Sequence, residues 1–160
     1  MQINIETHMK IEVGISERLG EILSKTYSSC LLVLDSGFYS TRIGKSIKNN
    51  LQKNLELTVI QTKSSNEPTY DDIDDYLQTA GFKTFKKNDN LQKSVVLGVG
   101  GGSAMDIAKV IAGLVTNVGS PLEYRGFDQL QNAGVDCYLV PTTAGTGSES
   151  SYNASLIDKS

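Results

Sequence analysis

Short apolar runs alternate with amphipathic stretches along most of the chain. A continuous apolar segment at 31–34 is typical of a strand that is covered on both faces, and the apolar runs 95–99 and 137–140 predict two further strands. Between them, apolar residues spaced three or four positions apart, as in the stretch 43–51, predict helices. This alternation predicts an α/β fold with a Rossmann-like, doubly wound and mainly parallel sheet.

Several further elements are expected outside these runs. Apolar and polar residues alternate at 3–5 and 11–13, which predicts half-exposed strands near a sheet edge. We expect one helix to start at Pro68, whose fixed φ and missing N–H suit a first turn, and to end at Gly81. The stretch 154–157 predicts the first strand of a hairpin.

Composition and charge narrow the class of protein. The chain has 160 residues, 39% of them hydrophobic, which suffices for one well-packed domain spanning 1–160. Its net charge of −3, with no basic tail, argues against binding to nucleic acid or to a membrane surface. The segment 1–13 lacks an apolar signal core and no apolar run approaches membrane-spanning length, so we expect a cytoplasmic protein.

Neither a disulfide nor a metal site is expected within this chain. Cys30 and Cys137 lie in apolar, strand-like runs and are interpreted as buried hydrophobic residues. The single histidine, His8, excludes a histidine-based metal site. The aspartates of 71–75 are better explained by the helix dipole than by a metal ion, because successive helical positions point in different directions. A solvated basic face is expected at Lys83, Lys86, Lys87 and Lys93.

The stretch 94–112, SVVLGVGGGSAMDIAKVIA, is the first candidate for ligand binding. An apolar strand is followed by a turn at 100–103 and then by a helix with an apolar face. The glycines let a ligand approach the backbone, and the first helical N–H groups and the helix dipole suit a phosphate or pyrophosphate. An ordinary strand-to-helix turn is the alternative, because Ser103 stands where a regular GxGxxG motif has its third glycine.

A second candidate loop, PTTAGTGSESS at 141–151, follows the apolar run 137–140. Its hydroxyl groups and free backbone N–H groups suit sugar hydroxyls, an amide or a phosphate. Thr146 and Glu149 have the spacing of a capping box, so a helical turn is expected to start here. The alternative is a hydroxyl-rich turn that satisfies its own backbone. Since both candidate loops follow strands, we expect them at the same edge of the sheet.

Asp35 is the third candidate, because it directly follows the apolar run 31–34. The carboxyl ends of strands are where α/β folds bind their ligands. An acid at this position can accept hydrogen bonds from the two hydroxyls of an adenosine ribose, and it would repel a 2′-phosphate. It therefore favours NAD over NADP.

Two motifs together resemble a known family. GGGSAMDIAK, followed by VPTTAGTGSE, is similar to the iron-containing (metal-dependent, group III) alcohol dehydrogenases, within the dehydroquinate synthase-like superfamily. The segments KIEVGISERLGEIL, LDSGF and EPT also fall where that family has comparable segments, so the resemblance covers nearly the whole chain. One departure is Glu67, where many members have Asn before Pro-Thr, and this puts a cofactor contact from that position in doubt.

The resemblance implies a nicotinamide dinucleotide held by the two motifs. Residues that would hold its pyrophosphate are Gly101, Gly102 and Ser103. Asp106 would lie near the nicotinamide end, and Asp35 matches the acid that accompanies NAD preference in this family.

The hydroxyl residues of the second motif would divide between the two ends of the cofactor. The resemblance implies that Thr142 and Thr143 contact the adenosine part. Thr146 and Ser148 would lie nearer the phosphates and the nicotinamide.

For the complete enzyme, the resemblance implies hydride transfer between an alcohol carbon and NAD, with an aldehyde or ketone as the oxidised partner. Family members bind Fe²⁺ or Zn²⁺ through a mostly helical second domain. We therefore expect this chain to be an amino-terminal fragment in which residues 1–160 bind the cofactor. Without catalytic or metal-ligating residues of its own, the fragment is expected to bind cofactor weakly and to be inactive.

Other functions fit the same residues. One is an NAD-using lyase similar to dehydroquinate synthase, or another enzyme acting on polyols or sugar phosphates. A different class is a non-catalytic nucleotide-binding module that works as this domain alone. The sequence is also compatible with a homodimer.

Overall fold

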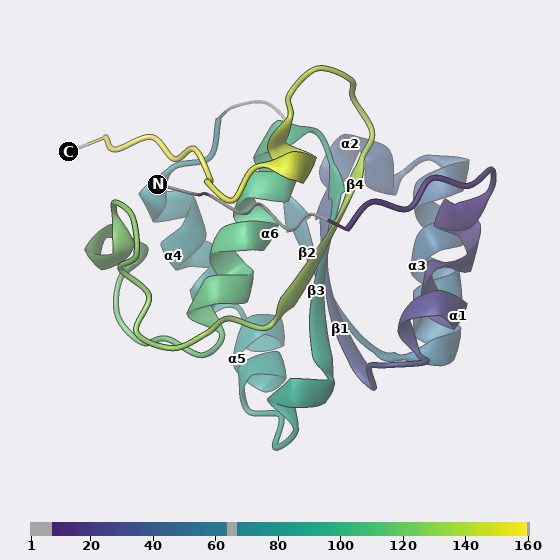
Figure 1. Cartoon of the computed structure of the whole chain (residues 1–160), viewed down its shortest axis with the longest axis horizontal. Coiled ribbons are helices and arrows are strands. Elements are labelled where there is room, and N and C mark those ends of the chain that lie inside the picture. Colours follow the sequence, from purple (N-terminus) through teal and green to yellow (C-terminus); the bar gives the residue numbers. More distant parts are fainter. Residues whose placement is uncertain (1–7, 64–66, 160) are drawn as a thin grey trace.

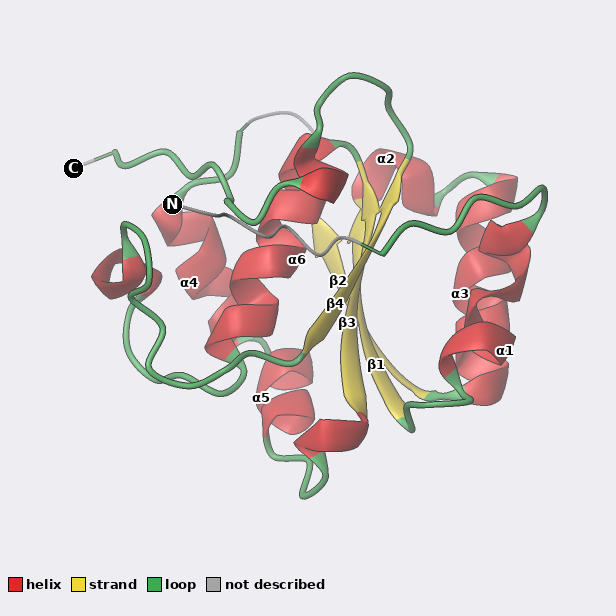
Figure 2. Ribbon diagram, in the orientation of Figure 1, coloured by secondary structure: helices red, strands yellow, loops and turns green. Residues whose placement is uncertain are grey.

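A four-stranded parallel sheet forms the centre of the protein (Figure 1, Figure 2). The computed structural model describes residues 8–63 and 67–159. The strands are β1 (Ser29–Asp35), β2 (Glu56–Thr62), β3 (Ser94–Gly100) and β4 (Asp136–Pro141). They lie in the order β2-β1-β3-β4, and Leu32 of β1 is in register with Val59 of β2 and Leu97 of β3. This confirms the Rossmann-like, doubly wound sheet that the sequence predicts.

Helices cover both faces of the sheet (Figure 2). On one face lie α1 (Leu19–Leu23) and α3 (Arg42–Asn54), and on the other lie α4 (Tyr70–Gln78), α5 (Ala80–Lys86) and α6 (Gly102–Leu114). The short helix α2 (Ser36–Tyr39) directly follows β1. Single 3₁₀ turns are η1 (Ile15–Arg18), η2 (Leu91–Lys93), η3 (Pro121–Tyr124) and η4 (Ser148–Ser150). Within the described ranges, no helix has the length and apolar character needed to cross a membrane.

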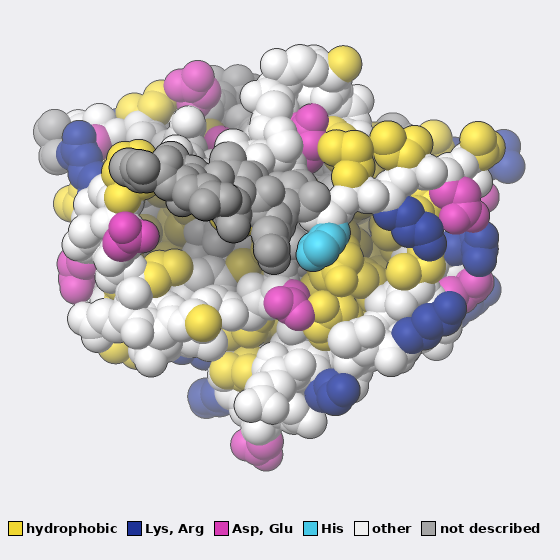
Figure 3. Space-filling model, in the orientation of Figure 1, with side chains coloured by type: hydrophobic (Ala, Val, Ile, Leu, Met, Phe, Trp, Pro, Cys, Tyr) yellow, Lys and Arg dark blue, Asp and Glu magenta, His cyan; other side chains and the backbone are white. Residues whose placement is uncertain are grey.

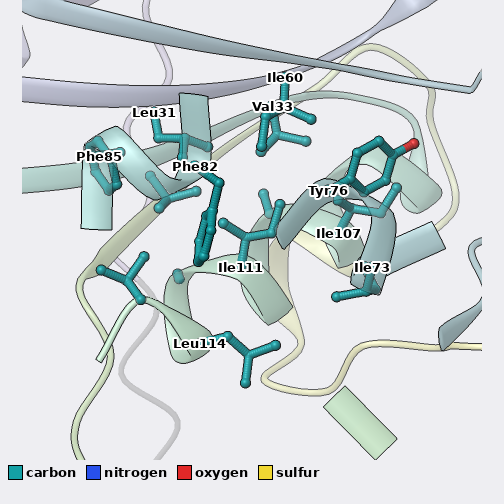
Figure 4. Packing of buried hydrophobic residues seen from close by; sticks show 14 residues of the cluster. Leu31, Val33, Ile60, Ile73, Tyr76, Phe82, Phe85, Ile107, Ile111 and Leu114 are labelled. Atoms are coloured by element: carbon teal, nitrogen blue, oxygen red, sulfur yellow. The ribbon is translucent and has the colours of Figure 1, made fainter. Parts of the chain in front are cut away.

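The strands divide their side chains between two buried clusters. Leu31 and Val33 of β1 face α4, α5 and α6, whereas Leu32 and Leu34 face α1 and α3. Burying each such side chain stabilises the fold by about 1.5–3 kcal/mol. Figure 4 shows the first cluster, whose labelled helical members are Ile73, Tyr76, Phe82, Phe85, Ile107, Ile111 and Leu114. Burial on both faces explains why β1 and β3 are apolar runs in the sequence, whereas the edge strands β2 and β4 are only partly buried.

A glycine in β3 sets how closely α6 packs on the sheet. A Cβ atom at Gly98 would lie 2.7 Å from Cβ of Ala108 and 3.0 Å from a methyl carbon of Leu139. Since only hydrogen fits between the strand and the helix, α6 lies directly against β3. This contact fixes where α6 begins relative to the end of β3.

The alternating segment 11–13 is not a strand, contrary to the expectation above. It precedes η1, and both Ile11 and Val13 are exposed. No described part of the chain covers either side of the segment. The apolar residues of the alternating pattern therefore do not face a core. The other predicted edge strand, 3–5, lies outside the described residues.

The expected helix from Pro68 to Gly81 is instead two helices. Thr69 is the N-cap of α4 and forms a capping box, because its Oγ1 accepts from the Asp72 N–H and the Asp72 carboxylate accepts from the Thr69 N–H. Thr79 then ends α4 and caps α5 by accepting from the Phe82 N–H, so Gly81 lies inside a helix. Side-chain caps therefore decide these boundaries.

Two other expectations are also wrong. The stretch 154–157 forms no hairpin strand; Ile157 makes an isolated parallel bridge with Thr69. Lys86 is not on a solvated face, because its Nζ donates to the carbonyl oxygens of Leu114 (3.0 Å) and Asn117 (2.8 Å) near the end of α6. Burial lowers the pKa of Lys86.

Candidate functional site

The carboxyl ends of β1, β3 and β4 meet at one rim of the sheet, at the top of Figure 1. The chain leaves β1 towards β2 on one side and leaves β3 towards β4 on the other, so the order reverses between β1 and β3. Ligands of open α/β sheets bind outside such a switch point. Asp35 ends β1 and Gly100 ends β3. A Cβ at Gly100 would lie 2.9 Å from Cβ of Asp35, so the acid and the glycine turn adjoin.

The turn after β3 exposes the start of α6. Gly101 is the N-cap of this helix, and no side chain in the described part of the chain caps it. A Cβ at Gly100 would also lie only 2.7 Å from Cβ of Ala104, so no larger residue fits there. The backbone N–H groups of the first helical turn, from Gly102 and Ser103 onward, are thus left for an external acceptor.

The hydroxyl loop, Thr142–Gly147, lies against this turn. The Thr142 N–H donates to the Gly100 carbonyl at 2.9 Å. A Cβ built on Gly101 would lie 3.3 Å from Oγ1 of Thr143, and one built on Gly102 would lie 3.3 Å from Cβ of Thr146. The threonine side chains are exposed. The structure therefore brings together the two loops that the sequence singles out.

The predicted capping box between Thr146 and Glu149 is absent. Thr146 Oγ1 accepts from the Ser148 N–H at 3.3 Å, and the N-cap of η4 is Gly147 in a left-handed conformation (φ 68°). A single 3₁₀ turn entered through a left-handed glycine does not align the Thr146 side chain with the Glu149 N–H. Glu149 instead buries its Oε2, which has no hydrogen-bond partner within the described residues.

Both carboxylate oxygens of Asp106 are engaged by the protein. Oδ1 accepts from the Ser148 hydroxyl at 2.6 Å and lies 2.8 Å from Lys109 Nζ, while Oδ2 accepts from the Ser155 N–H at 3.1 Å. Asp106 and Ser148, which the motifs assign to one cofactor site, are in direct contact. Lys109 was not predicted, although a spacing of three residues on one helix is a typical ion-pair spacing.

Asp35 has one oxygen in use. Its Oδ1 accepts from the Phe38 N–H at 2.9 Å and so caps α2. The residue is partly exposed at the rim. Such a carboxylate retains acceptor capacity for a further donor.

Two hollows border α6, and neither is lined by Asp35, by the turn 100–103 or by residues 142–147. One, of about 580 Å³, is bordered by Thr69 and Asp72 of the α4 start and by Ile107 of α6. The other, of about 880 Å³, lies along α6 and includes Lys109 and Phe127. Throughout residues 8–63 and 67–159, no three His, Cys, Asp or Glu side chains group closely enough to hold a metal ion.

This Rossmann-like architecture, with a glycine turn at the switch point, defines a class of α/β proteins that bind ligands at the strand ends. The chain matches the iron-containing alcohol dehydrogenase family over residues 7–160 and belongs to that family. This confirms the resemblance carried by the two motifs.

Among curated relatives, alcohol dehydrogenase 4 of Saccharomyces cerevisiae (strain ATCC 204508 / S288c) is 32% identical over 138 residues, which cover 86% of this chain and 34% of the relative. Sulfoacetaldehyde reductase of Bilophila wadsworthia is 30% identical over 145 residues, which cover 91% of this chain and 35% of the relative. The chain thus spans about a third of the length of these relatives.

Solved structures share the fold. A 1,3-propanediol oxidoreductase matches with a TM-score of 0.69 and 26% identity, over 85% of this chain and 34% of the other. The alcohol dehydrogenase from Oenococcus oeni has a TM-score of 0.69 and 25% identity over the same shares. A sulfoacetaldehyde reductase from Bifidobacterium kashiwanohense was solved in complex with NAD⁺. It matches with a TM-score of 0.66 and 23% identity, over 86% of this chain and 34% of the other.

Proposed function

We propose that residues 1–160 are the dinucleotide-binding domain of a metal-dependent alcohol dehydrogenase, which transfers hydride between a small alcohol and NAD⁺. The observation that carries this proposal is the contact between the glycine turn and the hydroxyl loop, beside the uncapped start of α6 and next to Asp35. Membership of the iron-containing alcohol dehydrogenase family supports the reaction class.

The pyrophosphate is proposed to bind at the start of α6. Its oxygens would accept from the N–H groups of Gly102 and Ser103, where the helix dipole favours negative charge. The absence of a side chain at Gly101 and Gly102 lets the phosphates approach the backbone. The Ser103 hydroxyl can supply a further hydrogen bond.

The two ends of the cofactor are assigned to opposite sides of this turn. Asp35 would accept from the ribose hydroxyls of the adenosine, with Thr142 and Thr143 nearby, and its charge favours NAD over NADP. Thr146 and Ser148 would lie nearer the phosphates and the nicotinamide, with Asp106 behind Ser148. A relative from Bacillus methanolicus, 29% identical over 147 residues, is named an NAD-dependent methanol dehydrogenase.

In this proposal the chain binds the cofactor and orients its nicotinamide ring. A divalent Fe²⁺ or Zn²⁺ ion, when bound, acts as a Lewis acid that polarises the substrate oxygen. We place its ligands in a carboxy-terminal domain beyond this chain, because the described residues offer no suitable group and the relatives are about three times longer. The substrate is proposed to be a small alcohol or the corresponding aldehyde.

Calorimetry on the 160-residue chain tests the site. We expect saturable binding of NAD⁺ and ADP-ribose, weakened at least about tenfold by Gly102→Val, because the valine would fill the phosphate position and press on Thr146. Ser103→Ala is expected to weaken binding less, since one hydrogen bond is lost. Ser24→Ala serves as the control, because Ser24 is exposed at the end of α1.

Two results would contradict the proposal. NAD⁺ binding that is unaffected by Gly102→Val would show that the pyrophosphate does not bind at the start of α6. Tight ATP binding without NAD⁺ binding favours a non-catalytic nucleotide-binding module instead.

A further inference from the structure

The hydroxyl loop (Thr142–Gly147) is held at its two ends. At its start, the Thr142 N–H donates to the Gly100 carbonyl of β3. At its end, Ser148 is buried, and its hydroxyl donates to Asp106 of α6 at 2.6 Å. Every residue between these anchors is exposed. The position of the loop over the glycine turn therefore depends on the two anchors.

Lys109 strengthens the second anchor. It lies one helical turn after Asp106, its side chain is only 11% exposed, and its Nζ is 2.8 Å from Asp106 Oδ1. The same ammonium group donates to the carbonyl oxygens of Ser148 (3.1 Å) and Ser151 (3.3 Å) and to that of Asn153. A largely buried ammonium group is stable only when its hydrogens are matched by acceptors. Lys109 thus draws the chain from 148 to 153 onto α6.

Asp106 is the acidic partner of Lys109 and also binds the chain beyond Ser151. Its side chain is 13% exposed, and the charge of Lys109 compensates its own. Its second oxygen accepts from the Ser155 N–H, so the pair holds the chain on both sides of Ser151. We call Asp106 and Lys109 the clasp.

We infer that Lys109 is a positioning residue for dinucleotide binding, because the clasp fixes Ser148 and with it the end of the hydroxyl loop against α6. This inference rests on the proposed function. The clasp holds the side assigned to the nicotinamide. The side assigned to the adenosine is held by Asp35 and by the Thr142–Gly100 hydrogen bond, which do not involve Lys109. Loss of the clasp should therefore affect the two halves of the cofactor unequally.

The test compares NAD⁺ and ADP binding to the 160-residue chain. Lys109→Met keeps an unbranched, largely apolar side chain but removes the ammonium group. It is expected to raise the dissociation constant for NAD⁺ about tenfold and that for ADP less than about twofold. Lys109→Arg retains the charge and is expected to keep NAD⁺ binding within about threefold of the parent chain.

Lys86→Met is the matched control. Lys86 also donates to backbone carbonyl oxygens, but at the opposite end of α6, so its loss should lower the melting temperature without changing the NAD⁺-to-ADP ratio. If Lys109→Met weakens NAD⁺ and ADP equally, or behaves as Lys86→Met does, the positioning role is overturned. Failure of the Arg variant to restore NAD⁺ binding overturns the role of the positive charge.

Hydrogen exchange separates this inference from the proposed function. Lys109→Met is expected to accelerate exchange of backbone N–H groups in 142–153, and Lys86→Met is not. A parent chain that does not bind NAD⁺ contradicts the proposed function, while the exchange rates still decide whether Lys109 holds the loop. Unchanged exchange in 142–153 contradicts the clasp whatever the chain binds.

Discussion

Asp35 shows how one side chain can have a structural role and a proposed binding role. Its Oδ1 caps α2 through the Phe38 N–H, and the residue ends β1 beside the glycine turn. Removing the carboxylate outright would change both the cap and the charge. Serine is also a good N-cap, so it can replace the first function without the second.

Asp35→Ser is therefore expected to change cofactor preference while keeping the fold. Removing the negative charge relieves repulsion of the 2′-phosphate, so the ratio of NADP⁺ to NAD⁺ affinity should rise about tenfold. Calorimetric titration with both cofactors measures this ratio. Asp89→Ser makes the same change of charge at the other end of the sheet and should leave the ratio unchanged. An unchanged ratio in Asp35→Ser would show that Asp35 does not face the ribose.

At the scale of elements, the contact between β3 and α6 determines the geometry of the candidate site. Gly98 leaves room for Ala108, and α6 consequently begins immediately after the turn that ends β3. A side chain at position 98 would have to push the helix outward, together with the N–H groups of its first turn.

Gly98→Ala is expected to lower the free energy of unfolding by about 1–3 kcal/mol, because the added methyl overpacks the interface. Ala108→Gly removes the facing methyl, so the double variant should lose less than the sum of the two single variants. Urea unfolding of all four proteins measures this coupling. Strict additivity would show that the methyl groups do not meet.

The pattern of the sequence predicted the buried elements better than the exposed ones. The runs 31–34 and 95–99 have to be apolar because helices cover them from both sides, so they are recognisable without the structure. The segment 11–13 has a strand-like alternation but is exposed. The ends of α4 depend on the caps at Thr69 and Thr79, which compete with the signals from the neighbouring proline and glycine.

At the scale of the whole molecule, contacts between distant parts of the chain form those parts of the candidate site that the sequence did not reveal. The glycine turn and the hydroxyl loop were predictable because each directly follows a recognisable strand. Lys109 was missed although its ion pair with Asp106 is local, because the backbone carbonyl groups that it holds lie 39 to 44 residues further along the chain. Lys86 was likewise expected in solvent, since nothing local indicates that it reaches the end of α6.

At the same scale, the 160-residue chain is expected to bind NAD⁺ without oxidising alcohols. It spans about a third of the length of its relatives, and the described residues contain no group suited to hold a metal ion. Adding Fe²⁺ or Zn²⁺ should therefore not produce NADH from NAD⁺ and a primary alcohol, as followed by NADH absorbance. A control without the chain gives the background rate. Metal- and alcohol-dependent NADH formation above that background would contradict the proposal that this chain binds the cofactor but not the metal ion.

The parallel arrangement of the strands leaves the end of the sheet opposite the rim free for attachment to a solid support. Asp89 is exposed in the turn that leads into β3 there, whereas burial raises the pKa of both native thiols, Cys30 and Cys137, to about 12. A thiol introduced by Asp89→Cys would thus react selectively with a maleimide-coated sensor. The immobilised protein would present its strand ends, and the loops that follow them, to the flowing solution.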